Sequence, residues 1–164
     1  MNPCPCGYYN HPEKECVCGP GIVQRYLNKI SGPLLDRIDL HVEVTPVSFD
    51  ELTQDETAEG SRDIRKRVEQ TRKLQQGRFG ERSGVHCNAQ MSQNDIKEFC
   101  KIDSESNALL KKAMDRMGLS ARAFDRILKV ARTIADIENS ERIETQHIAE
   151  AIQFRSLDKE GWAG

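Results

Sequence analysis

The chain has 164 residues, of which 37% are hydrophobic and 30% are charged, and its formal net charge is −2. This balance is typical of a soluble, largely helical protein with enough apolar residues to form a core. No apolar run approaches the ~18 residues that a membrane helix needs, and the first residues lack the pattern of a signal peptide. We therefore expect a cytoplasmic protein with no membrane partner.

The first eighteen residues contain four of the six cysteines as two Cys-x-Cys pairs, Cys4 with Cys6 and Cys16 with Cys18. In a reducing compartment, clustered cysteines indicate a metal site more often than a disulfide framework. Four thiolates suit a closed tetrahedral zinc site, although one intervening residue is tighter than the common two-residue knuckle. Two interpretations stay open: a zinc site, with His11 as a replacement for one ligand, or a reduced and partly buried loop.

Two short patterns follow the cysteine-rich segment. Apolar residues recur every four positions over 22–31, which predicts a short helix ending at Gly32-Pro33. Apolar and polar residues alternate over 38–44, which predicts a strand with one buried face. Because a lone strand is not stable in water, this segment is expected to pair with strands that lie elsewhere.

The charges in the middle of the chain are segregated. Residues 50–59 include five acidic residues and no base, whereas residues 62–82 include eight bases and three acids. The sequence predicts a polar helix over 61–76 and a loop over 78–86. A basic helix can bind nucleic acid, but charge alone favours a solvated face whose bases pair with the neighbouring acidic stretch.

Helix-capping residues divide the chain from residue 92 onward into four predicted helices. These helices cover about 92–100, 103–117, 120–138 and 145–155, and Gly118 ends the second of them. The predicted capping residues are Ser92 with Asp95, Asp103 or Ser104, Ser120, and Thr145.

The long helix that follows Ser120 has two distinct faces. At 100° per residue its apolar side chains fall in one sector, which predicts a core face: Phe124, Ile127, Leu128, Ala131, Ile134 and Ala135. Arg122, Arg126 and Lys129 fall on the opposite side, where they either bind an anion such as phosphate or form a solvated face. Arg122 lies in the first turn, where the helix dipole already favours an anion.

Four stretches together resemble the magnesium-chelatase-like AAA+ ATPases of the YifB/ComM family. They are MNPCPCG, QRYLNKISGPLLDRIDLHVEV, LSARAFDRILKVARTIADIE and IETQHIAEAIQFRSLD. The resemblance implies a mostly α fold with a small β component, in which the C-terminal part of an AAA+ α/β core precedes a helical-bundle lid. It implies that residues 1–50 form the C-terminal part of the AAA+ α/β core. Residues 51–91 are then a polar connector with a basic helix, and residues 92–164 are the lid.

The resemblance also implies roles for three residues. Asn2 in MNP matches the sensor 1 position, which orients the attacking water near the γ-phosphate. Arg37 in GPLLDRIDL matches an arginine finger that reaches the ATP of a neighbouring subunit, where a guanidinium stabilises transition-state charge. The residues alone favour a different interpretation, in which Arg37 pairs with Asp36 or Asp39 as ordinary surface charge. Arg122 in LSARAFDR matches sensor 2, the lid arginine that contacts nucleotide phosphates.

The sequence contains no G-x-x-x-x-G-K-[ST] phosphate loop and no strand that ends in an acidic pair for magnesium. The resemblance therefore implies the C-terminal part of a longer ring-forming ATPase, expected to be a hexamer that uses ATP and Mg²⁺. We expect the chain to be inactive alone. Zinc in the cysteine cluster is expected to hold the insertion after sensor 1 and to have no catalytic role.

DNA is the partner that the competence-related members of this family suggest, and the basic stretch over 62–82 is a candidate contact. Two alternatives stay open. One is an ATPase subunit that drives metal insertion into a tetrapyrrole, which rests on a shared fold alone. The other is a zinc-stabilised helical adaptor without ATP chemistry.

Overall fold

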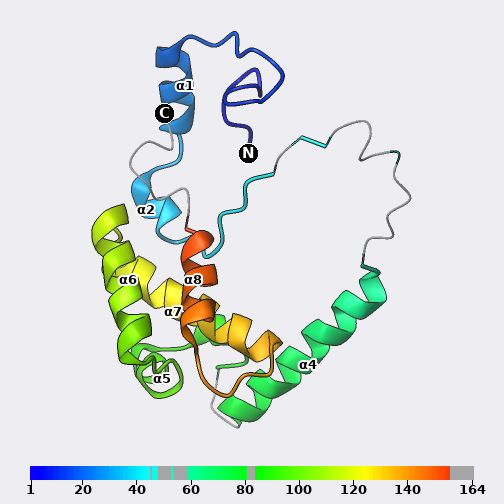
Figure 1. Cartoon of the computed structure of the whole chain (residues 1–164), viewed down its shortest axis with the longest axis vertical. Coiled ribbons are helices and arrows are strands. Elements are labelled where there is room, and N and C mark those ends of the chain that lie inside the picture. Colours follow the sequence, from blue (N-terminus) through cyan, green and yellow to red (C-terminus); the bar gives the residue numbers. More distant parts are fainter. Residues whose placement is uncertain (45, 48–52, 54–58, 81–83, 156–164) are drawn as a thin grey trace.

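The computed structural model describes residues 1–44, 46, 47, 53, 59–80 and 84–155, and within them the regular structure is helical (Figure 1). No described helix has both the length and the apolar character needed to cross a membrane. The helices are α1 (Pro20–Leu27), α2 (Gly32–Leu35), α4 (Ser61–Phe79), the 3₁₀ turn η1 (Asn88–Gln90), α5 (Gln93–Phe99), α6 (Ser104–Met117), α7 (Ala121–Ile137) and α8 (Thr145–Gln153).

The N-terminal caps predicted for three helices are present. Ser92 and Asp95 form a reciprocal capping box at α5, in which the Asp95 carboxylate accepts the Ser92 amide at 2.8 Å. Asp103 accepts the amide of Ser106 at 2.8 Å, and this hydrogen bond holds the pKa of Asp103 below its ordinary value. Ser120 accepts the amide of Ala123 at 3.2 Å and so begins α7.

The cap predicted for the last helix is wrong by one residue. Glu144 is the N-cap of α8, and its amide donates to Nδ1 of His147 at 2.9 Å. Thr145 is instead the first helical residue, and its hydroxyl lies 3.1 Å from that of Ser106 on α6. The packing of α6 against α8 brings the Thr145 hydroxyl next to Ser106, so it links the two helices instead of capping one. Local sequence cannot reveal such a distant partner.

The α7 helix is the centre of a bundle formed by α4, η1, α5, α6, α7 and α8, which we call the helical bundle. The predicted core face is confirmed, since Ile127, Ala131 and Ala135 are fully buried. The core also takes in side chains from the other helices of the bundle, including Phe79, Leu110 and Ile148. Removal of this apolar surface from water is the main source of the bundle's stability.

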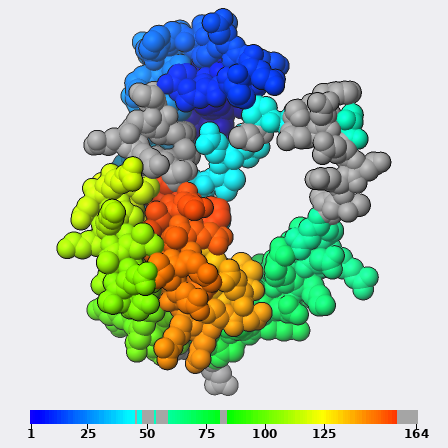
Figure 2. Space-filling view, in the orientation of Figure 1, coloured from blue at the N-terminus to red at the C-terminus, as the bar shows by residue number. Residues whose placement is uncertain are grey.

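The α4 helix is longer than predicted, because it continues through Phe79 and ends where Gly80 adopts a φ of 55°. Its C-terminal half packs on α7, where Thr71 and Gln75 are buried. Its N-terminal half projects away from the bundle (Figures 1 and 2). The predicted loop over 78–86 therefore begins later, and its residues 81–83 lie outside the described residues.

Residues 1–27 form a second and much smaller core. Cys4, Val23 and Leu27 are buried there, and the partly buried side chains around them are Cys6, Tyr9, Cys16, Cys18 and Tyr26. The predicted helix over 22–31 is present as α1 but ends at Leu27. Gly32-Pro33, expected to end a helix, instead opens α2, since proline fits the first turn of a helix.

The strand predicted over 38–44 is not formed, and the described residues contain no strand. A strand needs a hydrogen-bonded neighbour, and the described residues offer none. The amide of His41 instead donates to the carbonyl of Phe154 at 2.8 Å, while Leu40, Val42 and Val44 remain exposed. The mostly α class is thus confirmed, whereas the boundaries proposed for the three parts stay a prediction.

Candidate functional site

The four clustered cysteines converge on one point, beside α1. The Sγ atoms of Cys4, Cys6, Cys16 and Cys18 all lie within 4.8 Å of one another. The Sγ atom of Cys4 lies 3.3 Å from that of Cys6 and 3.7 Å from that of Cys16, and Cys6 and Cys16 are 3.6 Å apart. Tetrahedral zinc with Zn–S bonds of ~2.3 Å requires sulfur separations of about 3.8 Å. Three of the sulfurs therefore lie close to the spacing of a tetrahedral metal site, and the fourth, that of Cys18, lies within 4.8 Å of them.

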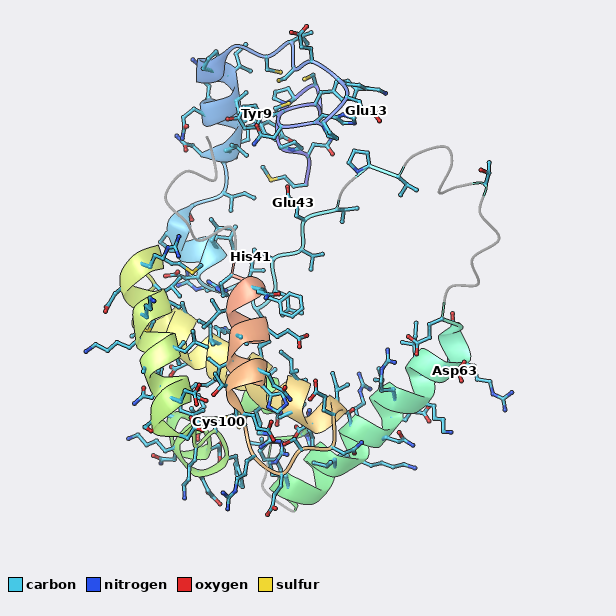
Figure 3. The ribbon with its side chains drawn as sticks, in the orientation of Figure 1. Tyr9, Glu13, His41, Glu43, Asp63 and Cys100 are labelled. Carbon is cyan, nitrogen blue, oxygen red and sulfur yellow. The ribbon has the colours of Figure 1, made fainter. Side chains whose placement is uncertain are left out.

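The loop around the cysteines holds His11 in a different role. Its Nδ1 accepts the backbone amides of Glu13 and Lys14, each at 3.1 Å. Its ring packs edge-on against Tyr8, at 5.6 Å between centroids. Figure 3 shows the same loop, with Tyr9 and Glu13 labelled beside the sulfur atoms. His11 is outside the group of convergent ligands, so the donor set is four cysteines.

The thiols of Cys6 and Cys16 differ in acidity although they lie in one small volume. A backbone hydrogen bond at Tyr8 lowers the pKa of Cys6 to about 6. At Cys16 a backbone hydrogen bond to Cys18 acts in the lowering direction, but burial and the sulfurs of Cys6 and Cys4 raise the pKa to about 12. Four thiolates so close together repel one another, and a divalent cation removes that repulsion.

Arg37 and Arg122 line the same cavity. Its volume is about 160 Å³. We call it the cationic pocket, and it is lined by Asp36, Arg37, Arg122, Asp125, Arg126 and Lys129. Four bases and two acids therefore surround a space between the α2 segment and α7, which is a composition suited to a small anionic group.

Arg37 is exposed and does not form the surface ion pair considered as the alternative. Its Nη1 donates to the carbonyl of Pro33 at 2.7 Å, one turn earlier. Asp39, one of its two candidate partners, is bound instead by Arg126 at 2.7 Å. One guanidinium nitrogen of Arg37 is thus fixed by backbone, and no other hydrogen bond or ion pair joins this guanidinium to a residue that the structure describes.

The three bases of α7 differ in what they contact. Arg126 bonds Asp39, and Lys129 donates to the carbonyl of Ala89 at 2.9 Å. Arg122 is exposed, and no hydrogen bond or ion pair links it to a described residue. Among the described residues, Arg122 is therefore the base of the predicted cationic stripe that has no partner, and its exposed guanidinium can meet an external anion.

The relative position of Arg37 and Arg122 is set by a residue that the sequence did not single out. Arg155, which is 1% exposed, donates to the carbonyl of Ile38 and to that of Leu35 at 3.4 Å. Together with the Asp39–Arg126 ion pair, it ties the segment around Arg37 to α7 and to the residues that follow α8. A charged residue at the end of a predicted helix carries no local sign of this role.

Asn2 lies apart from the cationic pocket and is not among its lining residues. It is exposed in the cysteine loop, where its side chain approaches Gly7. Gly7 has a φ of 85°, which favours glycine at this tight turn. The structure thus brings together Arg37 and Arg122 but not Asn2.

A buried polar network is a further feature that sequence analysis missed. The carboxylate of Asp136 is 0% exposed, and it accepts hydrogen bonds from Arg78, Arg132 at 3.0 Å and Asn88 at 2.7 Å. Gln75 also donates to it at 3.2 Å. The i, i+4 pair of Arg132 and Asp136 is the one part visible in the sequence. The network fixes α4 and η1 on α7.

Replacing Asp136 with alanine is expected to destabilise the helical bundle by about 3–5 kcal/mol, because two guanidinium groups lose their buried counter-charge. Urea unfolding followed by circular dichroism measures this change. The matched control is Asp115→Ala at an exposed position of α6, which should change stability by less than about 0.5 kcal/mol. Equal effects of the two substitutions would contradict the structural role of the network.

Two models of one protein family together match most of this chain. The family model described as "Magnesium chelatase, subunit ChlI" matches residues 1–52, and "Magnesium chelatase, subunit ChlI C-terminal" matches residues 58–155. The chain belongs to the magnesium-chelatase-like YifB/ComM family. The expected resemblance is thereby confirmed, and the bundle corresponds to the helical C-terminal part of this AAA+ family.

Three relatives of this magnesium-chelatase-like chain show how much of it is matched. It is 37% identical over 158 residues to "Competence protein ComM" of Haemophilus influenzae, which covers 96% of this chain. It is 39% identical over 160 residues to YifB of Escherichia coli, with 97% of this chain covered. A Mycobacterium tuberculosis relative is 32% identical over 154 residues, with 94% covered. The chain spans 30% of the length of each of these relatives.

Proposed function

We propose that this chain is the sensor and lid part of a ring-forming ATPase, and that Arg37 and Arg122 act together on the phosphates of one ATP molecule. The observation that carries this proposal is that both arginines line the cationic pocket. We assign the binding of the rest of the nucleotide, and of its Mg²⁺, to protein outside this chain, because this sequence contains no phosphate loop.

The chemistry of the pocket fits a phosphate group. The free guanidinium of Arg122 lies at the N-terminus of α7, where the helix dipole also attracts an anion. Arg37 offers a second planar donor set from the facing segment, held by its bond to Pro33. Two guanidinium groups that converge on a transferring phosphoryl group stabilise the charge that spreads over its oxygens in the transition state.

Since Arg37 and Arg122 belong to one cavity, we assign both to the same nucleotide. An arginine finger reaches the ATP of a neighbouring subunit, so Arg122 serves that neighbour's ATP as well. Asn2, which lies outside the pocket, is assigned to the ATP of its own subunit, where it orients the attacking water. This arrangement requires a ring, and we propose a hexamer.

DNA remodelling is the work that we assign to the ring. The printed name of the Haemophilus influenzae relative, a competence protein, supports this assignment. Metal insertion into a tetrapyrrole is the second candidate, which the description of the matching family models favours. Duplex unwinding or branch movement by the full-length protein, with no stimulation by a porphyrin, supports the first candidate over the second.

We also assign Zn²⁺ to the cluster of Cys4, Cys6, Cys16 and Cys18. The sulfur spacing supports this metal, and four sulfur ligands leave no open position for a substrate. The zinc is therefore structural. It holds the loop that carries Asn2 against α1, which leads through residues 28–31 to α2 and Arg37.

Replacing Arg122 with alanine in the full-length protein is expected to lower the kcat for ATP hydrolysis about a hundredfold to a thousandfold, because transition-state charge loses a donor. Steady-state phosphate release measures the effect. The matched control is Arg116→Ala, an exposed arginine of α6, which should leave kcat unchanged. Equal activity of the Arg122 variant and the control would remove Arg122 from the mechanism, and turnover by the isolated chain would overturn the need for further protein.

A further inference from the structure

The α4 helix carries an excess of positive charge that the helical bundle does not use. It contains seven bases and two acids between Ser61 and Phe79. Two of the bases are already paired within the chain: Arg78 with buried Asp136, and Arg67 with Glu59 through two bonds of 2.7 and 3.0 Å. The other five are exposed and have no ion pair with a described residue: Arg62, Arg65, Lys66, Arg72 and Lys73.

These five bases are not spread evenly around α4. At 100° per residue, Arg62, Lys66 and Lys73 fall within one narrow sector, opposite the side on which Thr71 and Gln75 are buried against α7. Arg65 and Arg72 both lie on one side of this sector, and Glu69 lies between them and the sector. The two paired bases, Arg67 and Arg78, lie outside it. The outward side of α4 is thus a cationic ridge, by which we mean Arg62, Lys66 and Lys73.

The ridge is held rigidly in an accessible place. The C-terminal half of α4 is fixed to α7 by the network around Asp136, so the N-terminal half projects from the bundle as an extension of a packed helix. Figure 3 shows side chains extending into solvent along this part of α4, near Asp63. From Arg62 to Lys73 the ridge spans about 16 Å at a rise of 1.5 Å per residue.

We propose that the cationic ridge of α4 binds the phosphate backbone of duplex DNA. This inference rests on the DNA assignment made above and names the surface that serves it. A DNA strand presents one phosphate per ~3.4 Å of duplex axis, so the ridge spans several phosphates. The one aromatic residue of α4 is Phe79, which is buried against Phe99, and the ridge therefore has no platform for stacking unpaired bases. The contacts are with phosphates and are independent of sequence.

The structure also corrects the choice of residues for a test. Charge along the sequence would select Arg65, Lys66 and Arg67, but Arg67 is bound to Glu59 on another side of α4. The informative variant combines Arg62→Gln, Lys66→Gln and Lys73→Gln. The matched control combines Lys111→Gln, Lys112→Gln and Arg116→Gln, which removes the same charge from exposed positions of α6.

The experiment measures binding of a 30-base-pair duplex of arbitrary sequence to the full-length protein by fluorescence anisotropy at several salt concentrations. Each lost phosphate contact reduces the slope of log affinity against log salt by about 0.9. The ridge variant is expected to reduce the slope by about 2 to 3, whereas the α6 control leaves it unchanged. ATP turnover without DNA should be the same for both variants, because neither changes the cationic pocket.

Three outcomes would overturn the proposal. A ridge variant with the slope of the α6 control shows that the ridge is a solvated face, while the ATPase assignment stands. Tighter binding of a single strand than of the duplex, lost in the ridge variant, replaces the duplex with single-stranded nucleic acid. If the unaltered protein does not bind the duplex, both the proposed role of the ridge and the proposed DNA remodelling are wrong. The proposed ATP hydrolysis is then tested separately by measuring ATP turnover.

Discussion

Protein purified without added metal is expected to contain one zinc ion per chain, and removal of that ion should unfold residues 1–27 while the helical bundle stays folded. The reason is the size of the N-terminal core, in which only Cys4, Val23 and Leu27 are buried. A core of three side chains cannot offset the chain entropy of 27 residues. Structural zinc contributes about 10–16 kcal/mol of apparent binding free energy in zinc-finger peptides, which are unfolded without their metal.

Elemental analysis and amide hydrogen exchange measure the two parts of this prediction. After chelation, the amides of α1 should lose protection, whereas those of α7 should keep theirs. Cys4→Ser should reproduce the effect, and Cys87→Ser is the matched control because Cys87 lies outside the cluster. Substoichiometric zinc in protein whose four clustered thiols titrate freely would contradict the assignment and leave the reduced loop as the correct interpretation.

Replacing Arg37 with alanine in the full-length protein is expected to lower kcat for ATP hydrolysis about a thousandfold or more, which is the effect of removing an arginine finger. ATP binding should change far less, since the guanidinium acts mainly on transition-state charge. The matched control is Arg25→Ala, an exposed arginine of α1 that does not line the cationic pocket.

The proposed action of Arg37 on the ATP of a neighbouring subunit gives this prediction a second readout. Rings that mix the Arg37 variant with subunits unable to bind ATP should regain activity at the interfaces where an intact Arg37 meets a bound nucleotide. If mixed rings are shown independently to assemble but regain no ATP hydrolysis, Arg37 does not act across the subunit interface.

The helical bundle could be predicted well because its signals are local. The caps at Ser92, Asp103 and Ser120 and the apolar face of α7 depend on residues within one or two turns. The one-residue error at Thr145 arose because its hydroxyl is used by Ser106, 39 positions away. Local patterns predict where helices begin but not which tertiary partner takes a side chain.

The errors concern contacts between distant segments. The alternation over 38–44 is a true strand pattern, but the pairing that a strand requires depends on a neighbouring strand, which the described residues do not supply. The roles of Asp136 and Arg155 were missed for the same reason, since their partners lie up to 120 positions away. The acidic stretch expected to neutralise the basic helix falls largely on residues 50–52 and 54–58, outside the described residues, and Glu59 alone shows such a pair, with Arg67.

The candidate site divides in the same way. The convergence of four cysteines followed from their paired spacing, because short loops bring such pairs together. The shared pocket of Arg37 and Arg122 did not follow, since they are 85 positions apart and their approach depends on Arg155 and the Asp39–Arg126 pair. Sequence resemblance suggested a separate role for each arginine, and their shared pocket supports the proposal that both act on the same nucleotide.

A double-mutant cycle on Arg37 and Arg122 tests this shared role most directly. The kcat of the full-length protein is measured for Arg37→Ala, Arg122→Ala and the double variant. Two groups that act on the same phosphoryl group should be coupled by about 1 kcal/mol or more, so the double variant loses much less than the product of the two single losses. Losses that multiply, with a coupling below about 0.5 kcal/mol, would mean that the two arginines serve different nucleotides.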